Sequence, residues 1–183
     1  MQRFTKITGM LFTIFLIQSF CLAQDGIGLK GIGGKLGLIS PEVIGSTIGF
    51  GVFADLGNIT PNIQLSANAD FWSKSFNSVS SFRDISFGAT GQYIFATPNT
   101  AIRPFAEAGL AFHALKNDVE GVNFLGQQQD FSTSSTKIGV DLGGGVLYQL
   151  SPQLDLLGQL KYRIVSNFNQ LNINAGVLYR LGK

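Results

Sequence analysis

The chain has 183 residues, of which 45% are hydrophobic and 13% charged, with 13 Lys and Arg against 11 Asp and Glu. One cysteine and one histidine exclude a disulfide framework and a histidine-rich metal site. A net charge of only +2 offers no basic surface for nucleic acid, so we expect no nucleic-acid partner.

The first 23 residues have the pattern of an export signal. Arg3 and Lys6 precede an apolar run, and Cys21-Leu22-Ala23 supplies small residues at the positions that signal peptidase reads. We therefore predict a signal peptide over 1–23 and one mature domain over 24–183, with 11 basic and 11 acidic residues. The alternative is lipidation of Cys21, which the bulky neighbour Phe20 disfavours.

The rest of the chain alternates apolar and polar residues in runs separated by turn clusters. Eight strands are predicted, near 29–39, 47–57, 63–73, 82–95, 102–115, 136–150, 153–165 and 171–182. Short proline-containing turns alternate with longer polar loops around 40–46, 74–81, 116–135 and 166–170. Short turns at one end and long loops at the other are typical of outer-membrane barrels, with the turns in the periplasm. The predicted fold is all-β, an eight-stranded antiparallel up-and-down transmembrane β-barrel.

The two faces of these strands differ in bulk. One face carries Phe, Tyr, Leu and Ile, and the other is rich in glycine, small polar residues and charges. In a soluble barrel the bulky apolar face would point into the lumen, but eight strands enclose a lumen that side chains only just fill. We therefore expect the bulky face to point outward, toward lipid. The aromatics of that face fall at two heights, as girdles do. Near the loop end these are Phe50, Phe71, Phe112 and Tyr162, and near the turn end Tyr93, Phe95, Tyr148 and Tyr179.

Charged residues concentrate on the predicted lumen side, as six acids and six bases. They are Lys35, Asp55, Asp70, Asp84, Arg103, Glu107, Lys137, Asp141, Asp155, Lys161, Arg163 and Arg180. Such charges in a narrow lumen are expected to neutralise one another, since an unpaired buried charge is costly. The alternative is a path that conducts protons or ions.

Depth along the strands suggests partners for these charges. Asp155 and Arg180 fall near the turn end, with Asp55 and Arg103 at similar height. Glu107 and Asp141 fall mid-barrel, with Lys35 as the best base at that level. The remaining members are expected to cluster toward the loop end, and they are Asp70, Asp84, Lys137, Lys161 and Arg163.

Two charges lie on the lipid side. Lys30 and Arg83 are each at a strand end, where a long side chain can reach the headgroups, and we interpret both as interfacial anchors. Residues 26–31 match the G-x-G-x-x-G pattern, but the strand before it and the helix after it that a dinucleotide site needs are missing. We expect no cofactor and no metal.

The pattern resembles the small eight-stranded outer-membrane barrels of the OmpA/OmpX type, the outer membrane protein beta-barrel domain group. The resemblance covers residues 26–183 and depends on strand count, turn and loop asymmetry, and segments such as RPFAEAGLAF and NINAGVLYRLG. It implies outer-membrane lipids as surroundings and insertion by the barrel-assembly machinery. The final alternation of Tyr179, Leu181 and Lys183 lacks the usual terminal aromatic residue, so the assembly signal would be a variant.

Two further features bear on function. His113 is the single histidine, and we interpret it as a satisfied lumen or rim residue; a lipid-acting enzyme would need a nucleophile and an acid beside it. The polar loop 116–135 is expected either to cap the barrel mouth or to contact an extracellular partner. The leading hypothesis is a non-enzymatic structural or surface-interaction protein of the outer membrane; the alternatives are a narrow solute or proton pore and a lipid-acting enzyme.

Overall fold

In the computed structural model, the described residues are 26–182 without 43, 77–79, 125–126 and 167. The strands are β1 (Ile27–Pro41), β2 (Thr47–Thr60), β3 (Ile63–Phe76), β4 (Ser80–Ile94), β5 (Ile102–Phe124), β6 (Gln127–Ser151), β7 (Leu154–Val165) and β8 (Gln170–Arg180). The described part of the chain contains no helix that is long and apolar enough to cross a membrane. The predicted signal peptide lies outside the described residues.

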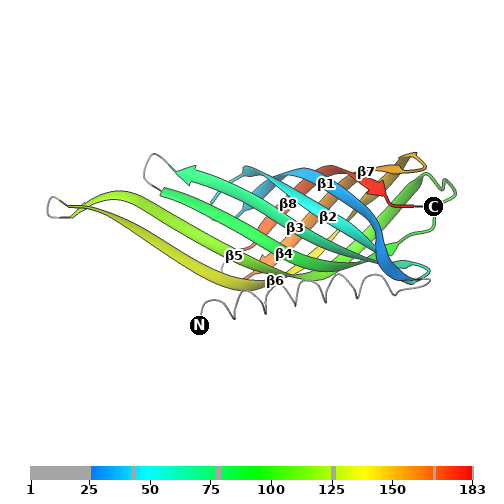
Figure 1. The fold of residues 1–183 in the computed structure, drawn as a ribbon, viewed down its shortest axis with the longest axis horizontal. Helices are drawn as coiled ribbons and strands as arrows, with labels where there is room; N and C mark the ends of the chain where they lie inside the picture. The colour runs from blue at the N-terminus through cyan, green and yellow to red at the C-terminus, as the bar shows by residue number, and fades with distance from the viewer. Residues whose placement is uncertain (1–25, 43, 77–79, 125–126, 167, 183) are drawn as a thin grey trace, which may run out of the picture.

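The eight strands form a closed ring in chain order, each antiparallel to its neighbours (Figure 1). The last strand closes the ring on the first, in a register that runs from Gly31 opposite Arg180 to Pro41 opposite Gln170. The predicted fold of eight up-and-down strands is confirmed. Inside β2, at the register shift between Asp55 and Asn58, Gly57 has a φ of 83°, a conformation that glycine adopts without steric cost.

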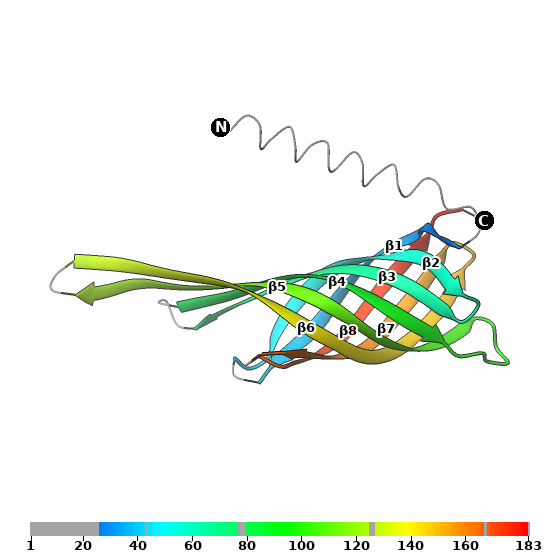
Figure 2. The same cartoon turned by 90° about the horizontal axis from the view of Figure 1, so that it is seen from below.

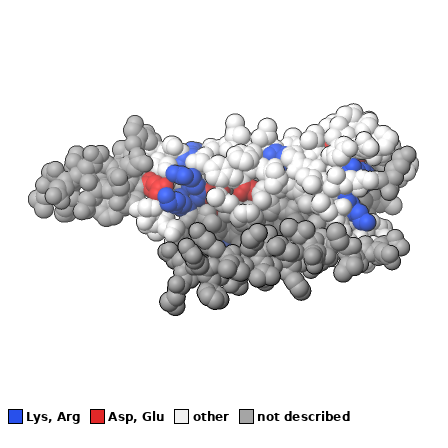
Figure 3. All heavy atoms as spheres, in the orientation of Figure 1, with Lys and Arg blue, Asp and Glu red and all other residues white. Residues whose placement is uncertain are grey.

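The bulky apolar face points outward. Ile48 and Leu36 are 75% and 65% exposed, whereas the charged side chains of Asp141 and Arg163 are 0% exposed. On the face shown in Figure 3, most described atoms belong to uncharged residues. Exposing this much apolar surface to water would be unfavourable, so the outer face fits a hydrocarbon environment.

Glycine on the inward face makes room for large side chains from the facing strands. A Cβ added to Gly145 would lie 2.7 Å from Cζ of Phe105, and one added to Gly139 would lie 2.7 Å from Cγ2 of Val165. Both distances are shorter than real Cβ contacts allow. The glycine-rich inward face is therefore a packing requirement of a crowded lumen.

The prediction of a loop over 116–135 is wrong. β5 continues to Phe124 and β6 begins at Gln127, so most of this segment forms a two-stranded ribbon that projects beyond the ring (Figure 2). The ribbon extends away from the barrel mouth, and it does not cap it. Its polar Ser, Thr and Gln residues satisfy their backbone groups in a ladder between β5 and β6.

Candidate functional site

The lumen is organised in layers, and β7 crosses all of them. From the turn end to the loop end, its inward side chains are Asp155, Leu157, Gln159, Lys161, Arg163 and Val165. This order gives a charged turn-end mouth, an apolar layer, a polar and charged middle, and a second apolar layer. Every one of these side chains is buried.

The turn-end mouth is built around Asp155. Its Oδ2 accepts hydrogen bonds from Nη2 of Arg103 at 2.6 Å and from Nε of Arg180 at 2.8 Å. Asp55, expected at the height of Arg103, instead accepts a hydrogen bond from the backbone N–H of Gly57 at 2.8 Å. One buried carboxylate therefore holds both arginines, which have 24% and 30% of their side-chain surface exposed toward the mouth.

Just inside this mouth lies the first apolar layer, which we call the inner plug. It consists of Phe105, Leu147, Leu157 and Leu178, with Phe53 and Ile94 packed against it. Its four members are 5% exposed or less. Close packing of such side chains leaves no aqueous channel at this level.

Arg163 is the centre of the polar middle. Its guanidinium donates to both carboxylate oxygens of Asp141, at 2.7 and 3.0 Å, to Oδ2 of Asp70 at 3.1 Å, and to Oγ of Ser86 at 3.0 Å. Lys35 reaches the same Asp70 through a 2.9 Å ion pair. The pairing of Lys35 with Glu107 and Asp141 that sequence depth suggested is therefore not the one observed.

The base beside Glu107 and Asp141 is Lys161. Its Nζ lies 3.6 Å from Oε1 of Glu107 and 3.4 Å from Oδ2 of Asp141. Glu107 also accepts hydrogen bonds from Nε2 of Gln92 at 3.1 Å and from Nε2 of Gln159 at 2.9 Å. Amide donors thus satisfy carboxylate oxygens that a single lysine could not.

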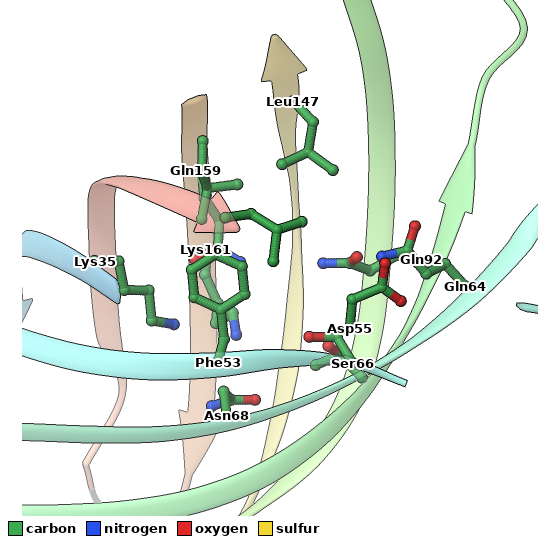
Figure 4. Close-up of a pocket in the computed structure, with 13 residues that line it drawn as sticks. Lys35, Phe53, Asp55, Gln64, Ser66, Asn68, Gln92, Leu147, Gln159 and Lys161 are labelled. Carbon is green, nitrogen blue, oxygen red and sulfur yellow. The ribbon is translucent and has the colours of Figure 1, made fainter. Parts of the chain in front are cut away.

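A small cavity of about 20 Å³ lies between this network and the inner plug, with Lys35, Gln92 and Lys161 on its wall (Figure 4). Oδ1 of Asn68, which also lines it, is buried without a hydrogen-bond partner among the described residues. A cavity of this size with polar walls has room for about one water molecule, and a continuous file of waters does not fit.

At the loop end, the Asp84 carboxylate contacts both the indole of Trp72 and the imidazole of His113. It accepts a hydrogen bond from Nε1 of Trp72 at 3.2 Å and lies 2.9 Å from Nδ1 of His113. All three are 1% exposed or less. His113 is thus a buried lumen residue with an acid beside Nδ1, whereas its Nε2 has no hydrogen-bond partner among the described residues, so the expectation of a fully satisfied histidine holds for one ring nitrogen only.

The second apolar layer, the outer plug, closes the loop end. It contains Ile39, Trp72, Leu115, Val165 and Phe168, with Ile44 and Phe82 against it. The Trp72 ring stacks on Phe82 and on Phe168, with ring centroids 5.5 and 5.8 Å apart. The sequence predicted neither plug. The plug residues that lie on strands do have the same parity as a lumen-facing polar residue of their strand, as Trp72 has with Asp70 and Leu115 with His113, and this parity is the signal that could have indicated them.

Above the outer plug lies an open cup of about 470 Å³. Its residues are Ile44, Phe82, Leu115, Asn117, Thr133, Ser135, Lys137 and Phe168. Lys137, expected in the lumen network, lies at this rim and donates from Nζ to the backbone carbonyl of Ser166 at 2.6 Å. The cup has an apolar floor and a polar wall supplied by the ribbon.

The aromatic residues assigned to the girdles are on the outer face. Phe71 is half-buried and the other seven are exposed. Phe50 and Phe71 are in contact at 5.2 Å, and Tyr93 meets Phe95 edge-on at 5.1 Å. Near the loop end, the Tyr162 hydroxyl donates to Oε1 of Glu42 at 2.9 Å.

Of the two charges that the sequence predicted on the lipid side, Lys30 and Arg83, Arg83 makes an ion pair that the sequence did not indicate. Its Nη2 lies 3.2 Å from Oδ2 of Asp118, and Nζ of Lys116 lies 3.0 Å from the other oxygen. Lys30 is exposed. Within the described residues, no group of three His, Cys, Asp or Glu side chains is arranged to hold a metal ion.

Comparison with known proteins agrees with this architecture. A family model described as "Outer membrane protein beta-barrel domain" matches residues 13–180. A search of curated proteins finds no match.

Solved structures of the same fold include three that are informative here. Neisserial surface protein A is 20% identical with a TM-score of 0.60, over 82% of this chain and 96% of that one. Ail, the attachment invasion locus protein of Yersinia pestis, is 14% identical with a TM-score of 0.57, over 86% and 100%. The outer membrane enzyme PagL is 16% identical with a TM-score of 0.51, over 81% and 99%. At these identities the likeness concerns the fold, which carries adhesive and enzymatic members alike.

Proposed function

The chain belongs to the outer membrane protein beta-barrel domain family, and from that premise we propose that it is a non-catalytic surface protein that binds an extended segment of an extracellular partner along the free edge of β6. The carrying observation is the juxtaposition of that edge with the apolar cup. In the described part of the chain, β7 pairs with β6 only from Gly139 onward, whereas β6 begins at Gln127. Residues 127–138 of β6 therefore have β5 on one side and no described strand on the other.

An unpaired strand edge offers a row of backbone donors and acceptors to an incoming strand. Thr133 and Ser135 line the cup, so their side of the edge faces the apolar floor. A peptide added to this edge would present alternate side chains to that floor, where Phe82 and Phe168 are available for apolar contact. Backbone pairing would supply affinity and the cup would select apolar side chains.

The two plugs support this role over the narrow pore. Layers built from Phe105, Leu147, Leu157 and Leu178 at one end and from Trp72 and its neighbours at the other leave no open path. The lipid-acting enzyme has one point in its favour, the contact between His113 and Asp84. Both side chains are buried inside the barrel, however, where an acyl chain in the membrane does not reach them.

The test is peptide binding by the purified barrel in detergent. The probe is a fluorescent ten-residue peptide of alternating Val and Thr, and the same composition interrupted by proline serves as its control. The variant Thr133→Asp with Ser135→Asp places charge on the cup wall, and Ser134→Asp with Thr136→Asp places it on the opposite side of the same strand. We expect saturable binding that only the cup-wall variant loses. Equal loss in both variants, or equal binding of the interrupted peptide, would contradict the proposal.

A further inference from the structure

The apolar outer face of β4 and β5 ends at a pair of cations. Toward the loop end, the facing residues of the two strands are Phe87 with Phe112, Ile85 with Ala114, and Arg83 with Lys116. Arg83 and Lys116 are therefore direct cross-strand neighbours on the side that faces lipid. Figure 3 shows basic and acidic atoms together near the ribbon end of the largely uncharged surface.

Their height places these cations at the membrane boundary. Tyr93, in the turn-end girdle, and Arg83 lie on the same outer face of β4, ten residues apart. At about 3.4 Å per residue and a strand tilt of about 40°, the rise between them is roughly 26 Å. The apolar band of an outer-membrane barrel is about 25 Å tall, so Arg83 falls where hydrocarbon gives way to headgroups.

The local charges do not cancel. Two cations directly opposite each other on a sheet repel, and Asp118 is the carboxylate that bridges them, at 3.2 Å from Arg83 and 3.0 Å from Lys116. The hydrogen bond from Lys116 holds the pKa of Asp118 below its ordinary value, so this carboxylate is charged at neutral pH. Among the side chains that the structure describes in this row, one negative charge against two positive ones leaves an excess of one positive charge.

Both cations keep donors free for a ligand. The side chains of Arg83 and Lys116 are 49% and 48% exposed. Ser73 pairs with Arg83 on β3, and Ser134 pairs with Lys116 on β6. The four residues form one row of hydrogen-bond donors across four strands, immediately above the apolar rows.

We propose that this row, centred on Arg83 and Lys116, binds the phosphate group of a lipid headgroup in the outer leaflet. Phosphate oxygens accept charge-assisted hydrogen bonds from guanidinium and ammonium groups, which are stronger than neutral ones. The exposed faces of Phe87 and Phe112 below the row would contact the acyl chains of the same lipid. A membrane lipid is the favoured source of the phosphate because the cations continue an apolar face and are not set in a water-facing pocket.

The test measures binding of dioctanoyl phosphatidic acid to the intact barrel in dodecyl maltoside, with dioctanoylglycerol as the neutral comparison. Arg83→Gln with Lys116→Gln removes both cations. The control variant, Lys30→Gln with Lys74→Gln, removes the same number of positive charges outside the row. Lys74 is a suitable control because it donates to the backbone carbonyl of Ser46, at 3.0 Å, and is not part of the row. We expect about tenfold weaker phosphatidic acid binding for the first variant and a change within twofold for the second.

Several outcomes would overturn the assignment. They are equal weakening in both double variants, or phosphatidic acid binding no tighter than dioctanoylglycerol. Inorganic phosphate that binds as tightly as phosphatidic acid would remove the lipid as the source. Tighter binding of inositol hexakisphosphate, lost in the Arg83 and Lys116 variant, would assign the site to a soluble polyanion instead. Heat-modifiable gel mobility verifies folding, and the single variants Arg83→Gln and Lys116→Gln carry the test if the double variant does not fold.

Discussion

Arg163 and Asp141 face each other across β7 and β6 in a two-pronged ion pair, with Nε 2.7 Å from Oδ1 and Nη2 3.0 Å from Oδ2. Both side chains are fully buried. The planar guanidinium also donates to Asp70 and Ser86, so one arginine side chain links strands β3, β4, β6 and β7 across the lumen. This geometry explains how a lumen with so many charges remains closed and folded.

Replacing Arg163 with Met should destabilise the barrel by about 3–5 kcal/mol, because Asp141 and Asp70 would keep buried charges with fewer partners. The measurement is urea unfolding in lipid vesicles. Arg83→Met, which removes a half-exposed cation from the outer face, should leave the unfolding midpoint nearly unchanged. Adding Asp141→Leu to Arg163→Met should recover part of the loss, and a double variant that loses the full sum would contradict the coupling.

The barrel should carry no current. In planar bilayers we expect no reproducible single-channel openings, because two apolar plugs and a paired charge layer lie in series. The variant Trp72→Ala with Phe168→Ala opens only the outer plug and should remain closed. Regular openings of the unaltered protein would favour the pore.

Tryptophan emission can test which face meets lipid. Trp72 is the sole tryptophan of the chain and is 1% exposed inside the barrel, so it should emit at short wavelength and resist quenching by brominated lipids. In a Trp72→Phe background, Phe87→Trp on the outer face should be quenched strongly. Strong quenching at position 72 with little at position 87 would mean that the faces are reversed.

His113→Ala should leave the barrel assembled. We expect a loss of about 1–3 kcal/mol in unfolding free energy, because the Asp84 carboxylate loses its contact with Nδ1 of His113 and keeps only the hydrogen bond from Trp72. Peptide binding at the cup should persist. Lipid profiles of cells that carry the variant or the unaltered protein should match. A lipid-modifying activity that vanishes with His113→Ala would establish the enzyme, and Ser86, its cross-strand neighbour, would then be the first nucleophile to replace.

The ion-pair partners show where inference from the sequence stops. Depth along the strands suggested Lys35 as the base beside Glu107 and Asp141, whereas Lys35 binds Asp70. Which heights meet across a closed ring depends on the stagger of all eight strands, and no single strand contains that information. Lys137 was misplaced for the same reason. It lies two residues before Gly139, the first residue of β6 that pairs with β7, and therefore at the rim of the barrel.

The ribbon was missed because its residues lack contrast. Ser132 to Thr136 are all hydroxyl residues, so no alternation marks them as strand, and polar runs of this kind read as loops. In the structure, β5 and β6 simply continue their ladder beyond the barrel. The pairing of two long neighbours, and not local propensity, decides the conformation here.

The sequence by itself determined the closed all-β architecture and the inversion of its faces, because strand geometry alternates side chains with a period of two and an eight-stranded lumen has little room. Only the tertiary structure decided which charges pair, that two apolar plugs seal the lumen, and that a free strand edge lies beside an apolar cup. Those features depend on ring closure and stagger, which bring together residues that are distant in the chain and that no local pattern relates.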